Sequence, residues 1–166
     1  MSSPEHKKLI WDLIKDIKVG MLVTKEGETD DSMRARPMYL VQDAYDGTLY
    51  FYTSRNAEKV YEIENDRDVC ITFSDVNEGV FVSLTGKASM TTDQELIDRY
   101  WNPGVNAWFE NGKDNDDIAI LKIKINRGEH WDSDENKLVQ LFETAKANVA
   151  ESTTPNVGEH EKFGVE

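Results

Sequence analysis

The chain has 166 residues and a formal net charge of -13 at pH 7, which suits one domain with a full hydrophobic core. So acidic a composition argues against nucleic acid and against an anionic membrane as partners, since both need a basic surface. The lone cysteine, Cys70, excludes an intramolecular disulfide and a cysteine-cluster metal site, and without a long apolar run or signal peptide we expect a cytoplasmic protein with no membrane partner.

The first half of the chain alternates helix and strand signals. A helix is expected over residues 3–18, where apolar residues recur at helical spacing. Strands follow at 20–27, 32–42 and 47–53, and an Asp-Gly turn within 43–47 makes the last two a hairpin. A helix over 54–68, capped by Ser54, leads to a strand at 68–75. The alternation in that strand predicts that Cys70 is a buried structural thiol rather than a nucleophile.

The second half predicts two long strands separated by a helix and a loop. The first strand covers 78–92 and is expected to bend at Gly86. A helix over 92–101 follows, with Thr92 and Glu95 as a capping box. The loop at 102–117 is long enough to suggest a functional or interface role. Residues 118–132 make one strand, or two broken at Gly128, and a final helix capped by Ser133 covers 133–150.

These elements predict a mainly β (α+β) fold. Six or seven strands with close turns favour an antiparallel sheet that closes into a small barrel with flanking helices. A helix does not follow every strand, which argues against a doubly wound parallel sheet. We expect one domain over residues 1–150 and a polar tail without fixed structure over 151–166.

The scarce cations are more informative than the many carboxylates. Arg34 and Arg36 lie two positions apart in a strand and therefore point to the same side. In "LYFYTSRNAEK" a strand runs into a helix that carries Lys59 in its first turns. Hydroxyl groups, free backbone N–H groups and a lysine at such a junction suit a phosphate. The alternative is that the arginines and Lys59 pair with nearby carboxylates, and the spacing leaves both interpretations open.

The familiar catalytic patterns are missing from this sequence. Its three histidines, His6, His130 and His160, are not spaced as a metal pair, so no metal site is expected. No nucleophile elbow, P-loop or dinucleotide-binding glycine pattern occurs. Trp108 and Trp131 lie at or beside loops, where each could cover a planar cofactor or simply pack.

Five segments in order resemble a known family. They are "RARPMYLV", "LYFYTSRNAEKVYEIEN", "VSLTGKA", "AWF" and "EHWD". Together they resemble the pyridoxamine 5'-phosphate oxidase-like split-barrel flavoproteins, over roughly residues 5–147. The loop "RYWNPGVNAWFENGKDNDD" is typical of the general stress protein branch. The resemblance implies a six-stranded antiparallel split β-barrel that forms a homodimer, with two flavin sites, FMN or alternatively FAD, at the dimer interface.

The resemblance also implies which residues bind the flavin. Lys59 would bind the phosphate, and the loop that holds Lys113 would approach from the partner subunit. Arg36 matches the family's arginine directly, whereas Arg34 is expected to be an ion-pairing residue. The full set that the resemblance implies is Arg36, Pro37, Met38, Tyr52, Thr53, Ser54, Lys59, Lys113 and Trp131.

Two departures from the family pattern limit the expected activity. Glu58 stands where the true oxidase has an arginine, and the acidic "WDSDENKLVQLF" stands where it has a basic segment. We therefore expect a flavin-binding general stress protein that acts as a flavin-dependent oxidoreductase on an unknown small molecule, and not a true pyridoxamine phosphate oxidase. The alternatives are a module that binds flavin or another planar cofactor without turnover, and a cofactor-free barrel that acts through its dimer surface.

Overall fold

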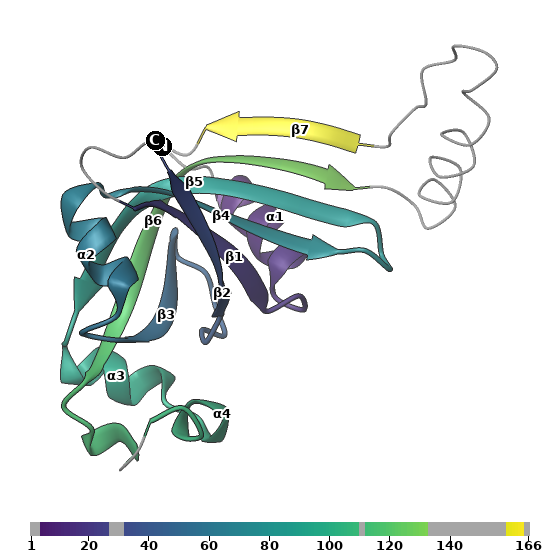
Figure 1. Cartoon of the computed structure of the whole chain (residues 1–166). Coiled ribbons are helices and arrows are strands. Elements are labelled where there is room, and N and C mark those ends of the chain that lie inside the picture. Colours follow the sequence, from purple (N-terminus) through teal and green to yellow (C-terminus); the bar gives the residue numbers. More distant parts are fainter. Residues whose placement is uncertain (1–3, 27–31, 110–111, 133–158, 165–166) are drawn as a thin grey trace.

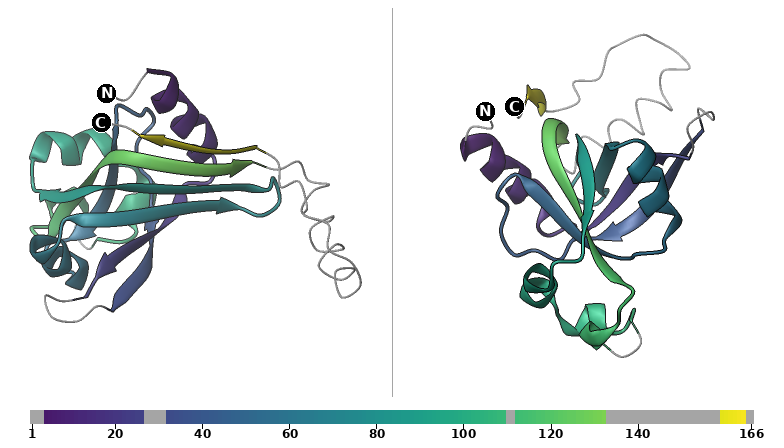
Figure 2. Two further views of the ribbon diagram at one scale, coloured as in Figure 1. Left: turned by 90° about the horizontal axis from the view of Figure 1, so that it is seen from above. Right: turned by 90° about the vertical axis from the view of Figure 1, so that its left-hand side faces the viewer.

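The computed structural model describes residues 4–26, 32–109, 112–132 and 159–164. Six antiparallel strands form the main sheet, in the order β2-β1-β4-β5-β6-β3. Their bounds are β1 (Val19–Lys25), β2 (Met33–Tyr39), β3 (Thr48–Ser54), β4 (Asp68–Asp75), β5 (Val80–Thr91) and β6 (Ile118–Asp132). The sheet curls so that β2 and β3 approach each other without pairing, which confirms the predicted split barrel (Figures 1 and 2). The hairpin predicted from the strands at 32–42 and 47–53 is wrong, because β2 pairs with β1 and β3 pairs with β6.

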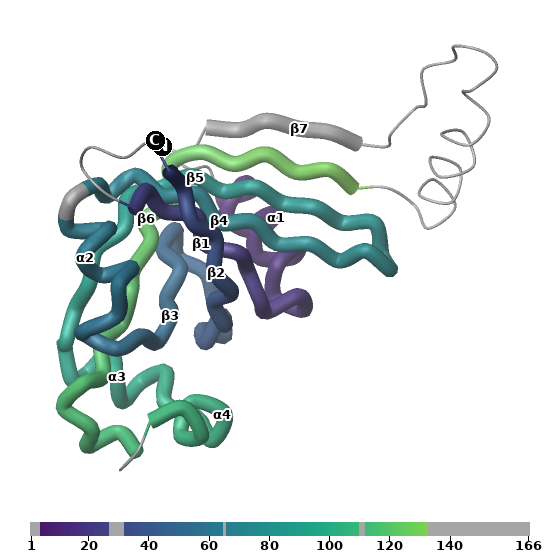
Figure 3. The backbone as a smooth tube through the Cα atoms, viewed as in Figure 1, coloured from purple at the N-terminus to yellow at the C-terminus, as the bar shows by residue number. Residues whose placement is uncertain are grey.

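Within the described residues, four α-helices and one short 3-10 helix flank the sheet. They are α1 (Pro4–Ile14), α2 (Glu58–Asn65), α3 (Gln94–Tyr100), α4 (Pro103–Asn106) and the 3-10 helix Gly112–Asp114. The smooth trace of Figure 3 shows α3 and α4 together at one end of the barrel, with α1 and α2 on different sides of it. None of the helices in the described ranges is long and apolar enough to cross a membrane.

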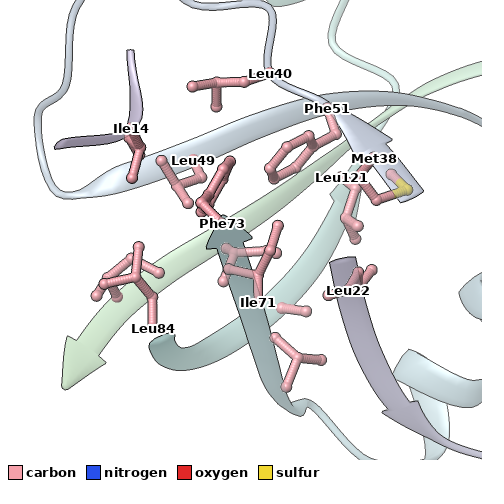
Figure 4. Close-up of a cluster of buried hydrophobic side chains, with 14 of the residues drawn as sticks. Ile14, Leu22, Met38, Leu40, Leu49, Phe51, Ile71, Phe73, Leu84 and Leu121 are labelled. Atoms are coloured by element: carbon pink, nitrogen blue, oxygen red, sulfur yellow. The ribbon is translucent and has the colours of Figure 1, made fainter. Parts of the chain in front are cut away.

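The main core lies inside the curled sheet. Leu22, Phe51, Ile71 and Phe73 are essentially inaccessible to solvent and point toward one another (Figure 4). Alternate residues of β1 and β4 supply this face, as the period of a strand requires. Cys70 falls on the other face of β4 and is only half-buried, with its sulfur 3.5 Å from the Ser83 hydroxyl. The prediction of a buried thiol is therefore wrong, because the alternation turns this residue outward.

The helix caps differ from the sequence prediction. Ser54 is the last residue of β3, and α2 begins at Glu58 after Ala57, whose side chain makes no capping bond. Asp93, rather than Thr92, caps α3 by accepting from the Glu95 backbone N–H at 3.0 Å. An aspartate can cap a helix as well as a threonine, so the pattern around residues 92–95 allowed either start.

The two long strands are continuous. β6 runs unbroken through Gly128, and the ladder between β5 and β6 shifts register between Thr85 and Gly86. This irregularity is the bend expected at Gly86. β7 (Glu159–Gly164) pairs antiparallel with β6, although the sequence predicts a tail without fixed structure over 151–166. The helix expected over 133–150, with Ser133 as its cap, lies outside the described residues.

Candidate functional site

Two arginines of β2 pair with two glutamates of α2, and the spacing of the arginines along the strand matches the spacing of the glutamates along the helix. Residues two apart on a strand are separated by about 6.7 Å, and residues four apart on a helix by about 6 Å. Arg34 pairs with Glu58 and Arg36 pairs with Glu62 in this register. Both arginines therefore have carboxylate partners, which confirms the ion-pairing role expected of Arg34.

The inner pair is buried. Arg36 and Glu62 expose only 14% and 8% of their side chains, and Arg36 Nη2 lies 2.8 Å from Glu62 Oε2. Thr24, buried on β1, donates its hydroxyl to the same carboxylate at 2.6 Å. Three elements thus meet at one carboxylate. A buried charge is costly unless it is paired and hydrogen-bonded, and Glu62 satisfies both conditions.

The outer pair is a surface feature. Arg34 and Glu58 expose 49% and 75% of their side chains. Exposed ion pairs contribute about 0–1 kcal/mol to stability. The pair still matters for the site, because it turns the Glu58 carboxylate toward Arg34. Glu58, which stands where the true oxidase has an arginine, is therefore paired within the subunit.

Lys59 and one arm of Arg36 have no partner among the described residues. Lys59 is half-buried on α2, and no carboxylate of the described residues pairs with it. Arg36 Nη1 is buried and makes no hydrogen bond to any described group. Burial lowers the pKa of Lys59, and the nearby Arg36 guanidinium lowers it further, while Glu62 raises it. Lys59 and Arg36 Nη1 lack acceptors among the described residues, and the two cations share the single carboxylate of Glu62, so a bound anion would balance the remaining positive charge.

The residues that flank this pair on β2 and β3 point in different directions. Met38 is buried in the main core, and Pro37 is exposed on the opposite face of β2. Thr53 is buried at the end of β3, where its hydroxyl lies 3.4 Å from the Ser54 carbonyl oxygen. Ser54 donates its hydroxyl to the Asp117 carboxylate. The Ser54 hydroxyl is therefore already used within the subunit.

The remaining predicted residues lie away from Arg36 and Lys59 within the subunit. Tyr52 donates its hydroxyl to the Ile97 carbonyl at 2.5 Å, and its ring packs edge-on against Trp101. Burial raises the pKa of Tyr52 well above its usual range. Trp131 lies on β6 opposite Phe81 and is half-buried. The structure thus brings together Arg36 and Lys59 of the predicted set, and it does not bring Tyr52, Lys113 and Trp131 to them within one subunit.

Lys113 borders a small polar cavity beside α3. Its Nζ lies 3.8 Å from an Asp98 carboxylate oxygen. The cavity has a volume of about 230 Å³ and is lined by Arg55, Gln94, Ile97, Lys113, Asp114, Asn115, Asp116 and Ile118. Its cations and carboxylates are balanced, so it shows no charge preference for a ligand. Among the described residues, no cluster of histidine, cysteine or carboxylate groups could hold a metal ion.

An apolar face lies exposed on β1 and β2. Val19, Met21 and Tyr39 expose 45%, 40% and 56% of their surface. They share one side of the sheet with Pro37, because Val19 pairs with Tyr39 and Met21 with Pro37. Exposed apolar side chains that gather on one face in this way make it a candidate interaction surface. The face was not predicted from the sequence, although the alternation of Val19, Met21 and Val23 is visible there.

Glu62 and Thr24 were also missed. The signal that could have found Glu62 is the spacing of Glu58 and Glu62 along one helix, which matches Arg34 and Arg36 along one strand. Thr24 gives no comparable signal, because only the pairing of β1 with β2 and the packing of α2 bring its hydroxyl to Glu62.

Comparison with known proteins identifies relatives of this chain. A family model for pyridoxamine 5'-phosphate oxidase-like proteins matches residues 5–156. General stress protein 26 of Bacillus subtilis (strain 168) is 32% identical over 127 residues, which cover 75% of this chain and 86% of that protein. The crystal structure of the general stress FMN/FAD binding protein from Xanthomonas citri is 29% identical, has a TM-score of 0.67 and aligns with 78% of this chain and 90% of its own. General stress protein 26 of Bacillus anthracis str. Sterne, at 22% identity and a TM-score of 0.65, covers 75% of this chain and 92% of its own and shares the fold.

Proposed function

Since this chain belongs to the pyridoxamine 5'-phosphate oxidase-like family, we propose that it is a flavin-binding general stress protein whose Arg36 and Lys59 hold the flavin phosphate. The observation that carries the proposal lies between β2 and α2: among the described residues, no carboxylate pairs with Lys59, and the buried Nη1 of Arg36 has no acceptor. A phosphate group is a strong hydrogen-bond acceptor and would supply the missing negative charge. The name of the Xanthomonas citri relative, an FMN/FAD binding protein, supports a flavin as the ligand.

FMN is the flavin we propose, with FAD as the alternative. Three charged groups remain at the site, namely Arg36, Lys59 and Glu62. Arg34 and Glu58 do not add to its net charge, because they neutralise each other at the surface. A single phosphate group suits a site that offers two cationic donors. Pro37 and Thr53 are proposed to border the ring and ribityl region, with Met38 behind them. When bound, the flavin would supply the redox chemistry, while the protein would hold and orient it.

A homodimer is proposed to complete the site. The exposed apolar face on β1 and β2 includes Pro37, which neighbours Arg36. A second copy of the chain on this face would cover Met21 and Tyr39 and would lie next to β2, whose other face carries Arg36. Tyr52, Lys113 and Trp131, which lie away from Arg36 within one subunit, would then contribute to the flavin site across the interface. Ser54 would contribute from the same subunit as Lys59, without its hydroxyl, which is bound to Asp117.

Light scattering at micromolar concentration is expected to give a dimeric mass for the parent protein. Met21→Glu places a charge in the middle of the apolar face, where it would be desolvated in a dimer, and we expect this variant to be monomeric. Val76→Glu is the matched control, because Val76 is also exposed, at 68%, but lies in the turn between β4 and β5. A monomeric parent, or a Met21→Glu variant that stays dimeric, would contradict the proposed interface.

Oxidation of pyridoxamine or pyridoxine 5'-phosphate is not expected. The segment after Trp131 begins with Asp132 and continues with Asp134 and Glu135. These carboxylates would repel a phosphorylated substrate, which carries about two negative charges near neutral pH. Hydrogen peroxide release from flavin-loaded protein should stay at background with each vitamer. Turnover on the order of 1 per second or faster would show a working vitamin oxidase instead.

The visible absorption spectrum of freshly purified protein tests the proposed function. A flavin spectrum supports it, and a colourless protein that acquires no flavin on incubation would leave the cofactor-free barrel as the explanation. Reduction of the bound flavin by NADH or NADPH separates an oxidoreductase on a small molecule from a module that holds flavin without turnover. A cytoplasmic location stays a prediction from the sequence.

A further inference from the structure

Glu62 is the acceptor around which the polar groups between β1, β2 and α2 are arranged. Its Oε2 accepts from the Thr24 hydroxyl at 2.6 Å, and Arg36 Nη2 lies 2.8 Å from Oε2 and 3.1 Å from Oε1. The two donors come from different strands, and the carboxylate comes from the helix. Thr24 and Glu62 are both buried. The carboxylate therefore has little freedom to move.

The contact with Glu62 determines which nitrogen atom of the Arg36 guanidinium group can bind a ligand. A guanidinium group is planar, so holding one terminal nitrogen restricts the direction of the other. Glu62 holds Nη2, and Nη1 is buried without a hydrogen-bond partner among the described residues. Lys59 precedes Glu62 by three residues, which places it on the same side of α2. Lys59 and Nη1 are thus the two cationic donors left for a ligand.

We propose that Glu62, itself fixed by Thr24, is a positioning residue for phosphate recognition: it holds the Arg36 guanidinium by Nη2 so that Nη1 and Lys59 together address the flavin phosphate. This inference rests on the proposed flavin site and adds to it a role for two residues that do not touch the ligand. Its consequence is specific, because the residues act on the phosphate end of the flavin and not on the ring.

A simpler role for Glu62 would be to neutralise Arg36. The two roles predict opposite results when the carboxylate is removed. If charge alone matters, deletion of a carboxylate beside an anion strengthens binding. If position matters, deletion weakens binding, because Arg36 loses its fixed orientation. Glu58 is the matched control, since it also pairs with a β2 arginine one helical turn away but is 75% exposed.

The experiment is to titrate flavin-free parent and variant proteins with FMN and with riboflavin, which lacks the phosphate. The ratio of the two affinities isolates the phosphate contribution. For Glu62→Ala we expect this ratio to fall about tenfold, as for one lost charge-assisted hydrogen bond. Glu62→Gln keeps an acceptor for Nη2 and should stay within about threefold of the parent. Glu58→Ala should leave the ratio unchanged or raise it.

Thr24→Val tests the same proposal without any change of charge. It removes the hydroxyl that fixes Glu62 but leaves the pair of Glu62 with Arg36 in place, so we expect the ratio to fall by less than in Glu62→Ala, about threefold. If Glu62→Ala does not fold, Thr24→Val alone tests the positioning role of Glu62. A ratio for Glu62→Ala at or above that of the parent, or an unchanged ratio for Thr24→Val, would overturn the positioning role. A parent protein that binds FMN no better than riboflavin would overturn the proposed phosphate site itself.

Discussion

Lys59→Ala is expected to weaken FMN binding by about tenfold to a hundredfold, the equivalent of one charge-assisted hydrogen bond to phosphate. Lys59 is half-buried beside Arg36, and among the described residues no carboxylate pairs with it. Its ammonium group is therefore available to a ligand. Fluorescence titration of flavin-free protein with FMN measures the loss.

Arg34→Ala is the matched comparison for Lys59→Ala. Arg34 is 49% exposed and already paired with Glu58, so we expect the affinity for FMN to stay within about twofold of the parent. Riboflavin should bind the Lys59 variant and the parent alike, because it carries no phosphate. An unchanged FMN affinity for Lys59→Ala, or an equal loss for Arg34→Ala, would show that the phosphate is held elsewhere.

Gly86→Ala is expected to destabilise the fold by about 3 kcal/mol or more, at the upper end of what overpacking costs. A Cβ atom at this position would lie 2.2 Å from the Lys124 carbonyl oxygen. That oxygen belongs to β6, which is held between β5 and β3, so it cannot easily move away. The residue also stands at the register shift of the β5–β6 ladder.

Urea unfolding of the parent and of Gly86→Ala measures this difference. Lys87→Ala is the control on the same strand, because Lys87 makes only an exposed ion pair with Asp68, and we expect it to change stability by less than about 1 kcal/mol. If Gly86→Ala changes the free energy of unfolding by less than about 1 kcal/mol, the prediction is contradicted. The backbones of β5 and β6 would then move apart at this position and keep the hydrogen bonds between the strands.

Much of the fold follows from local patterns. The strand at 118–132 has the same bounds in the sequence analysis and in the structure. Its residues Lys122, Ile123, Lys124 and Ile125 alternate between polar and apolar in the period of a strand. The start of α2 was placed too early, because Ser54 is a good helix cap in isolation. In the folded chain its hydroxyl is taken by Asp117, which lies 63 residues further along, and no local signal reveals that contact.

The candidate site was only partly predictable. Lys59 stands out in the sequence as a cation at a strand–helix junction, and Arg36 as one of two arginines on one side of a strand. The structure places Lys59 near Arg36. The contacts of Tyr52 could not be predicted. Strand alternation puts its side chain on the face opposite Phe51, but it does not reveal that α3 and Trp101 cover that face. The assignment of each arginine to its glutamate likewise depends on how α2 docks beside β2.

The central claim is that Arg36 and Lys59 form the flavin phosphate site of this chain. Calorimetric titration of the flavin-free parent protein with FMN, and in parallel with riboflavin, tests it most directly. The account predicts saturable binding of one FMN per subunit, tighter than the binding of riboflavin by at least about a hundredfold, since two charge-assisted contacts to phosphate are gained. Equal affinities for FMN and riboflavin, or no binding of either, would contradict it.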